Sequence, residues 1–178
     1  MQLLILDMDE TLIHATEHEL DRDSDFRVGS YFVYERPYLK EFLAFCQQHF
    51  KIGIWTTAGS EFAQAVFESA FPQNYPVEFI WSRKQCTRAY DPELMESYYI
   101  KNLAKLKRKG YLLEQIIMVD DTPRKLERNY GNLVRIKSWM GEANDGELLR
   151  LKSYLLELKE IENIRAAEKR GWETNYAL

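Results

Sequence analysis

The sequence predicts an α/β fold in which a mainly parallel sheet of about five strands carries helices on both faces. Three observations support this prediction. Short apolar runs typical of buried strands recur along the chain, at residues 3–6, 52–55, 77–81, 116–119 and 133–136. Apolar residues at helical spacing fill most of the intervals between these runs. Several runs end in acidic or hydroxyl side chains, at the sheet edge where ligands bind in open α/β folds.

The first apolar run leads directly into the segment Asp7-Met8-Asp9-Glu10-Thr11. Two carboxylates two residues apart point to opposite faces of an extended strand, so the chain must turn after Asp7 if both are to serve one site. One carboxylate can then act as a nucleophile while the other transfers a proton. Taken alone, such a pair of carboxylates more often marks a strand that runs into an acidic surface loop than a catalytic site.

A β-hairpin insertion is expected at about residues 14–36. About two dozen residues separate the first motif from the first predicted helix, which is long for a connection. Within it, Gly29-Ser30 lies between two apolar and aromatic runs, a pattern typical of a two-residue hairpin. The aromatic side chains Phe32 and Tyr34 either line a substrate groove or pack within the hairpin.

Four helices are predicted. They are expected to begin near Pro37, near Ser60, near Pro92 and after Asn144. The third should cover about residues 92–109, and its basic end at 105–109 complements the helix dipole. We prefer this explanation of the basic run to a nucleic-acid site. The residues from about 165 to 178 form a polar tail.

The composition argues against several classes of protein. The 178 residues suit one domain, assigned to residues 1–178, and 46% hydrophobic residues indicate a folded chain. A net charge of −4 gives no support to general nucleic-acid binding. Two cysteines are too few for a disulfide framework, and no apolar run approaches the roughly 18 residues of a membrane span. With no signal peptide evident, we expect a soluble protein that is cytoplasmic or, in a eukaryote, nuclear.

Polar residues at the ends of three predicted strands are expected to meet. Thr56 follows the second apolar run, and Asp120 and Asp121 follow the fourth. In a parallel sheet these strand ends share one edge with Asp7 and Asp9. Crowded carboxylates raise one another's pKa, and a bound divalent cation removes that repulsion.

This predicted cluster has the chemistry of a phosphoryl-group receptor. Oxygen ligands without His or Cys favour Mg²⁺. Lys101 or Lys105 is expected to supply a further positive charge. Metal, lysine, hydroxyl and backbone amides together can bind a phosphoryl group.

Motifs spread over roughly residues 1–160 carry a resemblance to a known family. Residues 7–14 are similar to the motif DLDETLVH, and residues 35–43 to RP-x-x-x-EFL. Residues 55–58 are similar to the second motif, a strand that ends in Thr, and residues 99–103 to Y-x-K-D-L, which contains the third-motif lysine. Residues 119–123 are similar to the fourth motif, and residues 136–139 to the segment after the last strand. The chain thereby resembles the haloacid dehalogenase (HAD) superfamily. Within it, the chain is similar to the FCP/SCP-like phosphatases, which act on the C-terminal domain of RNA polymerase II.

The resemblance implies a HAD-like Rossmannoid sheet with a small β-hairpin insertion and no large cap domain. It implies that Asp7 is the nucleophile and a metal ligand. Asp9 would be the general acid and base, with its backbone carbonyl on Mg²⁺. Thr56 and Lys101 would bind the phosphoryl oxygens, and Asp121 would ligate the metal.

The same resemblance suggests supporting residues. Asp120 would orient Lys101 or a metal-bound water, and Thr11 would support the turn through a side-chain hydrogen bond. Arg83, in a segment similar to R-x-x-C, would approach the substrate. The insertion is shorter here than in the eukaryotic C-terminal-domain phosphatases, where it lines a groove for a phosphopeptide.

Three functions are compatible with these features. The leading hypothesis is a Mg²⁺-dependent phosphomonoester hydrolase that forms an aspartyl-phosphate and acts on phosphoserine or phosphothreonine in a protein or peptide. The absence of a large cap would admit such a bulky substrate. The alternatives are a small-molecule or nucleic-acid-end phosphatase and a non-catalytic phosphoprotein-binding module. The complete set of motif residues favours an enzyme, and neither a membrane nor nucleic acid is an expected partner.

Overall fold

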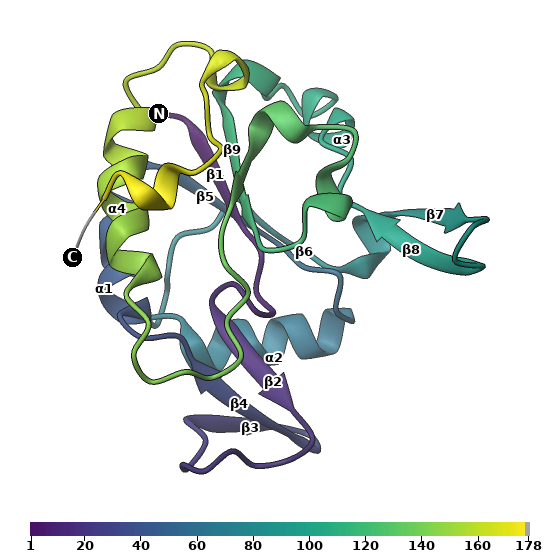
Figure 1. The fold of residues 1–178 in the computed structure, drawn as a ribbon, viewed down its shortest axis with the longest axis vertical. Helices are drawn as coiled ribbons and strands as arrows, with labels where there is room; N and C mark the ends of the chain where they lie inside the picture. Colours follow the sequence, from purple (N-terminus) through teal and green to yellow (C-terminus); the bar gives the residue numbers. More distant parts are fainter. Residues whose placement is uncertain (177–178) are drawn as a thin grey trace.

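A central parallel sheet organises the chain (Figure 1). The computed structural model describes residues 1–176. The strands of the sheet are β1 (Leu3–Leu6), β5 (Lys51–Trp55), β6 (Phe79–Trp81), β9 (Ile116–Asp120) and β10 (Leu133–Arg135). They pair in parallel in the order β10-β9-β1-β5-β6. The predicted α/β class and its parallel sheet are confirmed.

Helices cover both faces of this sheet. One core cluster unites α1 (Leu39–His49), α2 (Ser60–Ala70) and α4 (Glu147–Leu158), and a second contains α3 (Ala104–Lys107). Consecutive strand side chains point to opposite faces, so Leu4 of β1 belongs to the first cluster and Ile5 to the second. Short 3₁₀ helices complete the connections, at η1 (Arg83–Gln85), η2 (Leu113–Gln115), η3 (Pro123–Leu126), η4 (Tyr130–Asn132), η5 (Ile164–Ala166) and η6 (Trp172–Thr174).

The insertion after the first motif is a small antiparallel sheet. Its strands are β2 (Ile13–Thr16), β3 (Phe26–Val28) and β4 (Tyr31–Glu35), paired in the order β2-β4-β3. The predicted turn at Gly29-Ser30 joins β3 to β4, and Gly29 has a φ of 58°, as a tight hairpin turn requires. Sequence reasoning missed β2. In Figure 1 this sheet projects from the body of the fold beside α2.

The predicted helix over residues 92–109 is wrong. Residues 87–100 form a second hairpin, β7 (Thr87–Asp91) and β8 (Glu96–Ile100), and only α3 is helical. Contacts with a distant segment stabilise the hairpin: the guanidinium of Arg124 forms ion pairs with Asp91 and Glu96 and lies 3.8 Å from the ring centre of Tyr98. Tertiary contacts therefore override the helical spacing in this segment.

Two expectations near the C-terminus are also corrected. The N-cap of α4 is Gly146, and not Asn144, and just before it Asp145 Oδ1 accepts a hydrogen bond from the backbone N–H of Glu147 at 3.0 Å. The tail is more than a polar segment, since Trp172 is only 2% exposed and its indole N–H donates to the carbonyl oxygen of Arg135 at 2.7 Å. The last residues of the predicted tail, 177–178, lie outside the described part of the chain.

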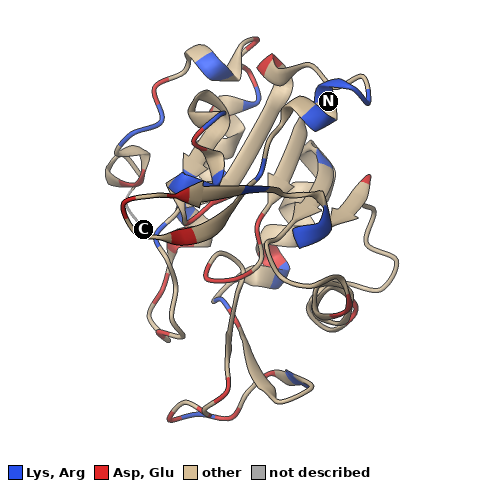
Figure 2. Ribbon diagram, turned by 90° about the vertical axis from the view of Figure 1, so that its right-hand side faces the viewer, with Lys and Arg blue, Asp and Glu red and all other residues tan. Residues whose placement is uncertain are grey.

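Basic and acidic segments are mixed over the molecule. Figure 2 shows Lys and Arg interspersed with Asp and Glu along the ribbon. The basic run at 105–109 covers part of α3 and the turn after it, so it does not extend into a long charged helix. Within the described residues, none of the helices has the length and apolar character needed to span a bilayer.

Candidate active site

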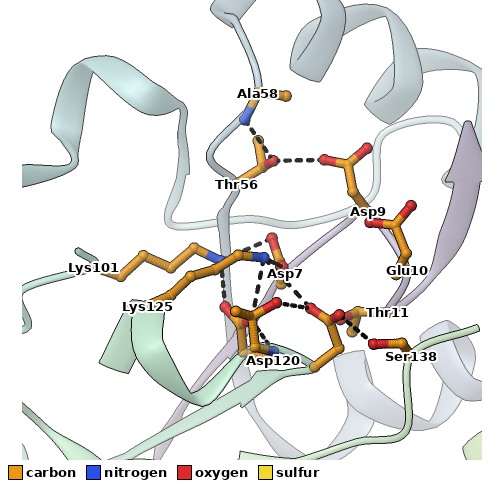
Figure 3. Close-up of polar contacts among 12 residues, drawn as sticks. Asp7, Asp9, Glu10, Thr11, Thr56, Ala58, Lys101, Asp120, Lys125 and Ser138 are labelled. Carbon is orange, nitrogen blue, oxygen red and sulfur yellow. Dashed lines mark hydrogen bonds and ion pairs between the residues drawn. The ribbon is translucent and has the colours of Figure 1, made fainter. Parts of the chain in front are cut away.

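The carboxyl ends of three neighbouring strands bring the predicted polar residues together (Figure 3). Asp7 follows β1, Thr56 follows β5, and Asp120 ends β9. The three side chains are each 0% exposed, which is unusual for polar groups and requires partners. These partners define the chemistry of the site.

A tight turn after Asp7 lets both carboxylates of the first motif face the same site. The backbone N–H groups of Leu12 and Ile13 donate to the carbonyl of Met8 at 2.8 and 3.1 Å. Glu10 adopts a left-handed conformation with φ of 55°, and its carbonyl accepts from the N–H of Trp139 at 2.8 Å. The turn is therefore fixed by backbone hydrogen bonds.

Arg36, one residue before Pro37, anchors this turn to the rest of the fold. Its guanidinium is buried and donates to Thr11 O at 3.0 Å and to both carboxylate oxygens of Asp145 at 2.9 Å. The expected side-chain hydrogen bond of Thr11 is absent, because its hydroxyl is buried without a partner among the described residues. The backbone carbonyl of Thr11, and not its hydroxyl, supports the turn.

Two lysines hold Asp7 in its charged form. Lys101 Nζ lies 2.8 Å from Asp7 Oδ1, and Lys125 Nζ lies 2.7 Å from Asp7 Oδ2. Burial by itself would raise the pKa of Asp7, but the two ammonium groups outweigh it and lower the pKa to about 2. Asp7 is therefore a buried side chain held as a carboxylate, the form of the group that can act as a nucleophile.

Asp9 has the opposite electrostatic environment. Its Oδ2 accepts a hydrogen bond from Thr56 Oγ1 at 3.0 Å, and the Thr56 oxygen in turn accepts from the N–H of Ala58 at 3.0 Å. Burial, followed by the charge of Asp7, raises the pKa of Asp9. A carboxyl group with a raised pKa holds its proton more readily, which suits a general acid.

Three carboxylates lie close enough together that they could hold a cation. Oxygen atoms of Asp7, Asp120 and Asp121 all lie within 4.8 Å of one another. Burial and the charge of Asp7 raise the pKa of Asp120 to about 6, although Lys101 donates to it at 2.6 Å. Ser138 Oγ donates to Asp121 at 2.6 Å. The donor set is all oxygen, so it fits a hard divalent ion such as Mg²⁺.

Lys125 is a site residue that sequence reasoning missed. It lies on η3, and its ammonium is 2.7 Å from Asp7, 3.3 Å from Asp120 and 3.4 Å from Asp121. The charges of these three carboxylates outweigh burial and raise the pKa of Lys125. The available signal was its position only four residues after Asp121, in the short segment that leaves the strand end.

Of the two candidate lysines from the sequence, only Lys101 lies in this cluster. Lys105 Nζ instead donates to the carbonyl of Gln85 at 2.6 Å. The main chain also links the two site lysines, since the N–H of Lys101 donates to the carbonyl of Lys125 at 2.7 Å. Figure 3 shows their side chains extending together toward Asp7.

The three residues expected to contact substrate differ in how exposed their side chains are. Arg83 is exposed next to the end of β5, where its Nε donates to the carbonyl of Thr57 at 2.7 Å, and its contact with substrate stays a prediction. Tyr34 is 0% exposed and its hydroxyl accepts from the N–H of Leu20 at 2.8 Å, so it packs within the insertion and does not line a groove. Phe32 is half-buried, and the guanidinium carbon of Arg27 lies 4.2 Å from the centre of the Phe32 ring.

A protein family model matches most of the chain. The model of the family described as NLI interacting factor-like phosphatase matches residues 2–165. The matched segment includes Asp7, Asp9, Thr56, Lys101 and Asp121. It ends before Trp172, so the C-terminal segment described above lies outside it.

Curated relatives carry related names. CTD small phosphatase-like protein 2 of Dictyostelium discoideum is 27% identical over 172 residues, which cover 91% of this chain and 28% of that protein. Nuclear envelope morphology protein 1 of Saccharomyces cerevisiae is 26% identical over 163 residues, 78% of this chain and 35% of that protein. The putative CTD phosphatase-like protein 355R of Invertebrate iridescent virus 3 is 27% identical over 161 residues, 76% of this chain and 83% of that protein. This chain therefore spans a minor part of the first two relatives.

Solved structures share the fold. The structure of Fcp1, an essential RNA polymerase II CTD phosphatase, superposes with a TM-score of 0.66 at 14% identity, covering 89% of this chain and 62% of that chain. A fission yeast Fcp1 variant bound to beryllium fluoride superposes with a TM-score of 0.58 at 18% identity, covering 89% of this chain and 50% of that chain. At these identities the similarity shows a common fold.

Proposed function

Because the chain belongs to the NLI interacting factor-like phosphatase family, we propose that it hydrolyses phosphomonoesters through an aspartyl-phosphate on Asp7. One observation carries this proposal: Asp7 and Asp9 lie in the same turn with shifts of pKa in opposite directions. A pair of carboxyl groups in such different environments can divide the work of nucleophile and acid.

In the first step, a carboxylate oxygen of Asp7 forms a bond to phosphorus as the bond between phosphorus and the leaving oxygen breaks. Asp9 donates its proton to that leaving oxygen. In the second step, Asp9 removes a proton from a water molecule, whose oxygen attacks phosphorus and releases Asp7 and inorganic phosphate. Lys101, whose Nζ lies 2.8 Å from Asp7, and Thr56, whose hydroxyl donates to Asp9, would bind the phosphoryl oxygens.

The proposal includes a Mg²⁺ ion. Asp7, Asp121 and the backbone carbonyl of Asp9 would hold it, while Asp120 keeps Lys101 in position through their hydrogen bond of 2.6 Å. When bound, the ion would neutralise charge on the phosphoryl oxygens. Ser138 and Thr122 both donate to Asp121, which fixes the orientation of that carboxylate.

A phosphorylated protein or peptide is the proposed substrate class. Between residues 1 and 176, the segments inserted into the fold are the three-stranded insertion and the β7–β8 hairpin, neither of which is a large cap domain. Without a large cap domain over the strand ends, the site would admit a bulky phosphoserine or phosphothreonine substrate. Two of the relatives are named as CTD phosphatase-like proteins, which supports the same class.

Hydrolysis of a generic aryl phosphate tests the chemistry. We expect turnover by the wild type with Mg²⁺, loss of turnover in chelator, and no turnover by Asp7→Asn, because a neutral amide cannot attack phosphorus. The exposed Asp23 provides a matched control, and Asp23→Asn should retain full activity. Substantial turnover by purified Asp7→Asn would exclude the aspartyl-phosphate route. Binding of phosphopeptide without any turnover would instead favour a binding module.

A substrate panel tests the substrate class separately. Phosphoserine and phosphothreonine peptides should have higher kcat/KM than sugar phosphates, nucleotides and 5′-phosphorylated oligonucleotides. Preference for one of the latter would retain the proposed chemistry and assign the protein to the small-molecule or nucleic-acid-end phosphatases.

A further inference from the structure

The ammonium of Lys125 occupies the space between the carboxylates that would bind a metal. It contacts Asp7 Oδ2 at 2.7 Å and Asp121 Oδ1 at 3.4 Å, which are oxygens of two proposed metal ligands. Lys101 differs, because it contacts the other oxygen of each shared carboxylate: Asp7 Oδ1 at 2.8 Å and Asp120 Oδ2 at 2.6 Å, whereas Lys125 contacts Asp7 Oδ2 and, at 3.3 Å, Asp120 Oδ1. The two lysines therefore approach different edges of the cluster.

A metal and Lys125 cannot share these oxygens without strong repulsion. Mg²⁺ binds carboxylate oxygens at about 2.0–2.1 Å, so an ion on Asp7 Oδ2 and Asp121 Oδ1 would lie within a few ångström of the lysine nitrogen. Two cations at such a separation repel, and the interior of the site screens the repulsion much less than water does. Occupancy of the carboxylates by one cation disfavours the other.

We propose that Lys125 is a built-in competitor of the metal, which neutralises Asp7, Asp120 and Asp121 in the metal-free protein and leaves them when Mg²⁺ binds. This inference rests on the proposed function. It predicts a weaker affinity for Mg²⁺ than the carboxylates alone would have. It also predicts that the metal-free protein stays folded, since the ammonium replaces part of the missing positive charge.

The structure provides a route for this exchange. The Lys125 side chain is 15% exposed, whereas the Lys101 side chain is 0% exposed. Lys125 belongs to the short helix η3 at the edge of the site, so its side chain can rotate toward solvent while the backbone stays in place. Its carbonyl can thus keep the hydrogen bond of 2.7 Å from the N–H of Lys101.

Calorimetric titration of substrate-free protein with Mg²⁺ tests the inference. Lys125→Met removes the charge and keeps an unbranched side chain, and it should lower the Kd for Mg²⁺ by about tenfold or more. Lys125→Arg retains the charge and should bind Mg²⁺ about as weakly as the wild type. Lys84→Met removes an exposed lysine from η1 and should leave the Kd unchanged.

Thermal unfolding supplies a second measurement. In chelator, Lys125→Met should have a lower Tm than the wild type, and saturating Mg²⁺ should raise its Tm by more than it raises that of the wild type. A variant that folds only when Mg²⁺ is present would support the inference in its strongest form. If Lys125→Met does not fold in either condition, the Mg²⁺ affinities of Lys125→Gln and Lys125→Arg test the inference instead. The neutral Gln variant should then bind Mg²⁺ more tightly than the charged Arg variant.

Two negative outcomes have different meanings. An equal or weaker Mg²⁺ affinity of the neutral variants overturns the competition, and turnover of an aryl phosphate by the wild type with Mg²⁺ would still support the proposed function. Such a result would assign Lys125 to phosphoryl binding, with a raised KM in Lys125→Met. Absence of Mg²⁺ binding in every variant, together with hydrolysis that resists chelator, would remove this inference and the proposed metal together.

Discussion

At the scale of single residues, Asp7 and Asp9 show how position gives identical side chains different chemistry. Asp7 lies between two ammonium groups, which lower its pKa to about 2 against the effect of burial. Asp9 accepts one hydrogen bond from Thr56, but burial and the neighbouring charge of Asp7 raise its pKa. The backbone turn after Asp7 creates this difference, because it directs the second carboxylate away from the lysines.

The replacement Asp9→Asn tests this division of labour. It keeps the shape and the backbone carbonyl of Asp9 but removes the transferable proton, so turnover should fall by roughly 10²- to 10⁴-fold. Affinity for Mg²⁺ should change much less than turnover. The loss should be largest for substrates with poor leaving groups, which need protonation most. Wild-type turnover with such a substrate would show that another group is the acid.

The sequence was sufficient to identify site residues that directly follow predicted strands. It was not sufficient for residues whose place depends on contacts between other segments. Asp7, Asp120 and Thr56 could be placed because a parallel sheet brings its strand ends to one edge. Lys125 was missed because it lies beyond the motif, on a 3₁₀ helix. The burial of Tyr34 depends on the loop that covers it, which carries no periodic signal.

At the scale of secondary structure, the strands of the central sheet were predictable and the β7–β8 hairpin was not. The sheet strands are continuous apolar runs, which are typical of strands buried on both faces. The hairpin at Thr87–Asp91 and Glu96–Ile100 has exposed and half-buried residues and depends on Arg124, a residue distant in sequence. The spacing of apolar residues along the sequence therefore favoured a helix at residues 92–109, which the contacts with Arg124 exclude.

The pairing of β5 with β6 permits a test of packing between two elements. Gly53 is the register partner of Phe79, and a Cβ added to Gly53 would lie 2.8 Å from Phe79 Cε2. Gly53→Ala should therefore lower the free energy of unfolding by about 1–3 kcal/mol, measured by urea unfolding. Phe79→Leu should relieve the clash, so the double variant should lose less than the sum of the single losses. Additive losses would show that the ring does not constrain Gly53.

At the scale of the whole molecule, the site depends on segments that lie far apart in the sequence. Arg36 joins the turn at Thr11 to Asp145, whose carboxylate accepts a hydrogen bond from the first residue of α4, Glu147. Trp172 joins the C-terminal segment to Arg135 of β10, and the register partner of Arg135 is Asp120. We propose that these links make the chain one cooperative unit, as its length and composition predict.

The replacement Trp172→Ala tests that proposal. Trp172 is 2% exposed and stacks on Tyr154 of α4 with ring centres 5.2 Å apart. Truncation of a buried aromatic side chain usually lowers the free energy of unfolding by about 3–5 kcal/mol. We expect a loss of this size, in a single urea transition monitored by circular dichroism. Trp172→Phe keeps an aromatic ring stacked on Tyr154 and should lower the free energy of unfolding by less than Trp172→Ala does.

The exposed Tyr130 provides a control, and Tyr130→Ala should change the free energy of unfolding by less than about 1 kcal/mol. A loss as small as this for Trp172→Ala would show that the C-terminal segment is an appendage to the fold. Two separate transitions would show that it unfolds independently of the sheet. A single transition at a lower urea concentration would place the segment in the same cooperative unit as β9 and β10, because the tryptophan then stabilises the edge strand beside Asp120.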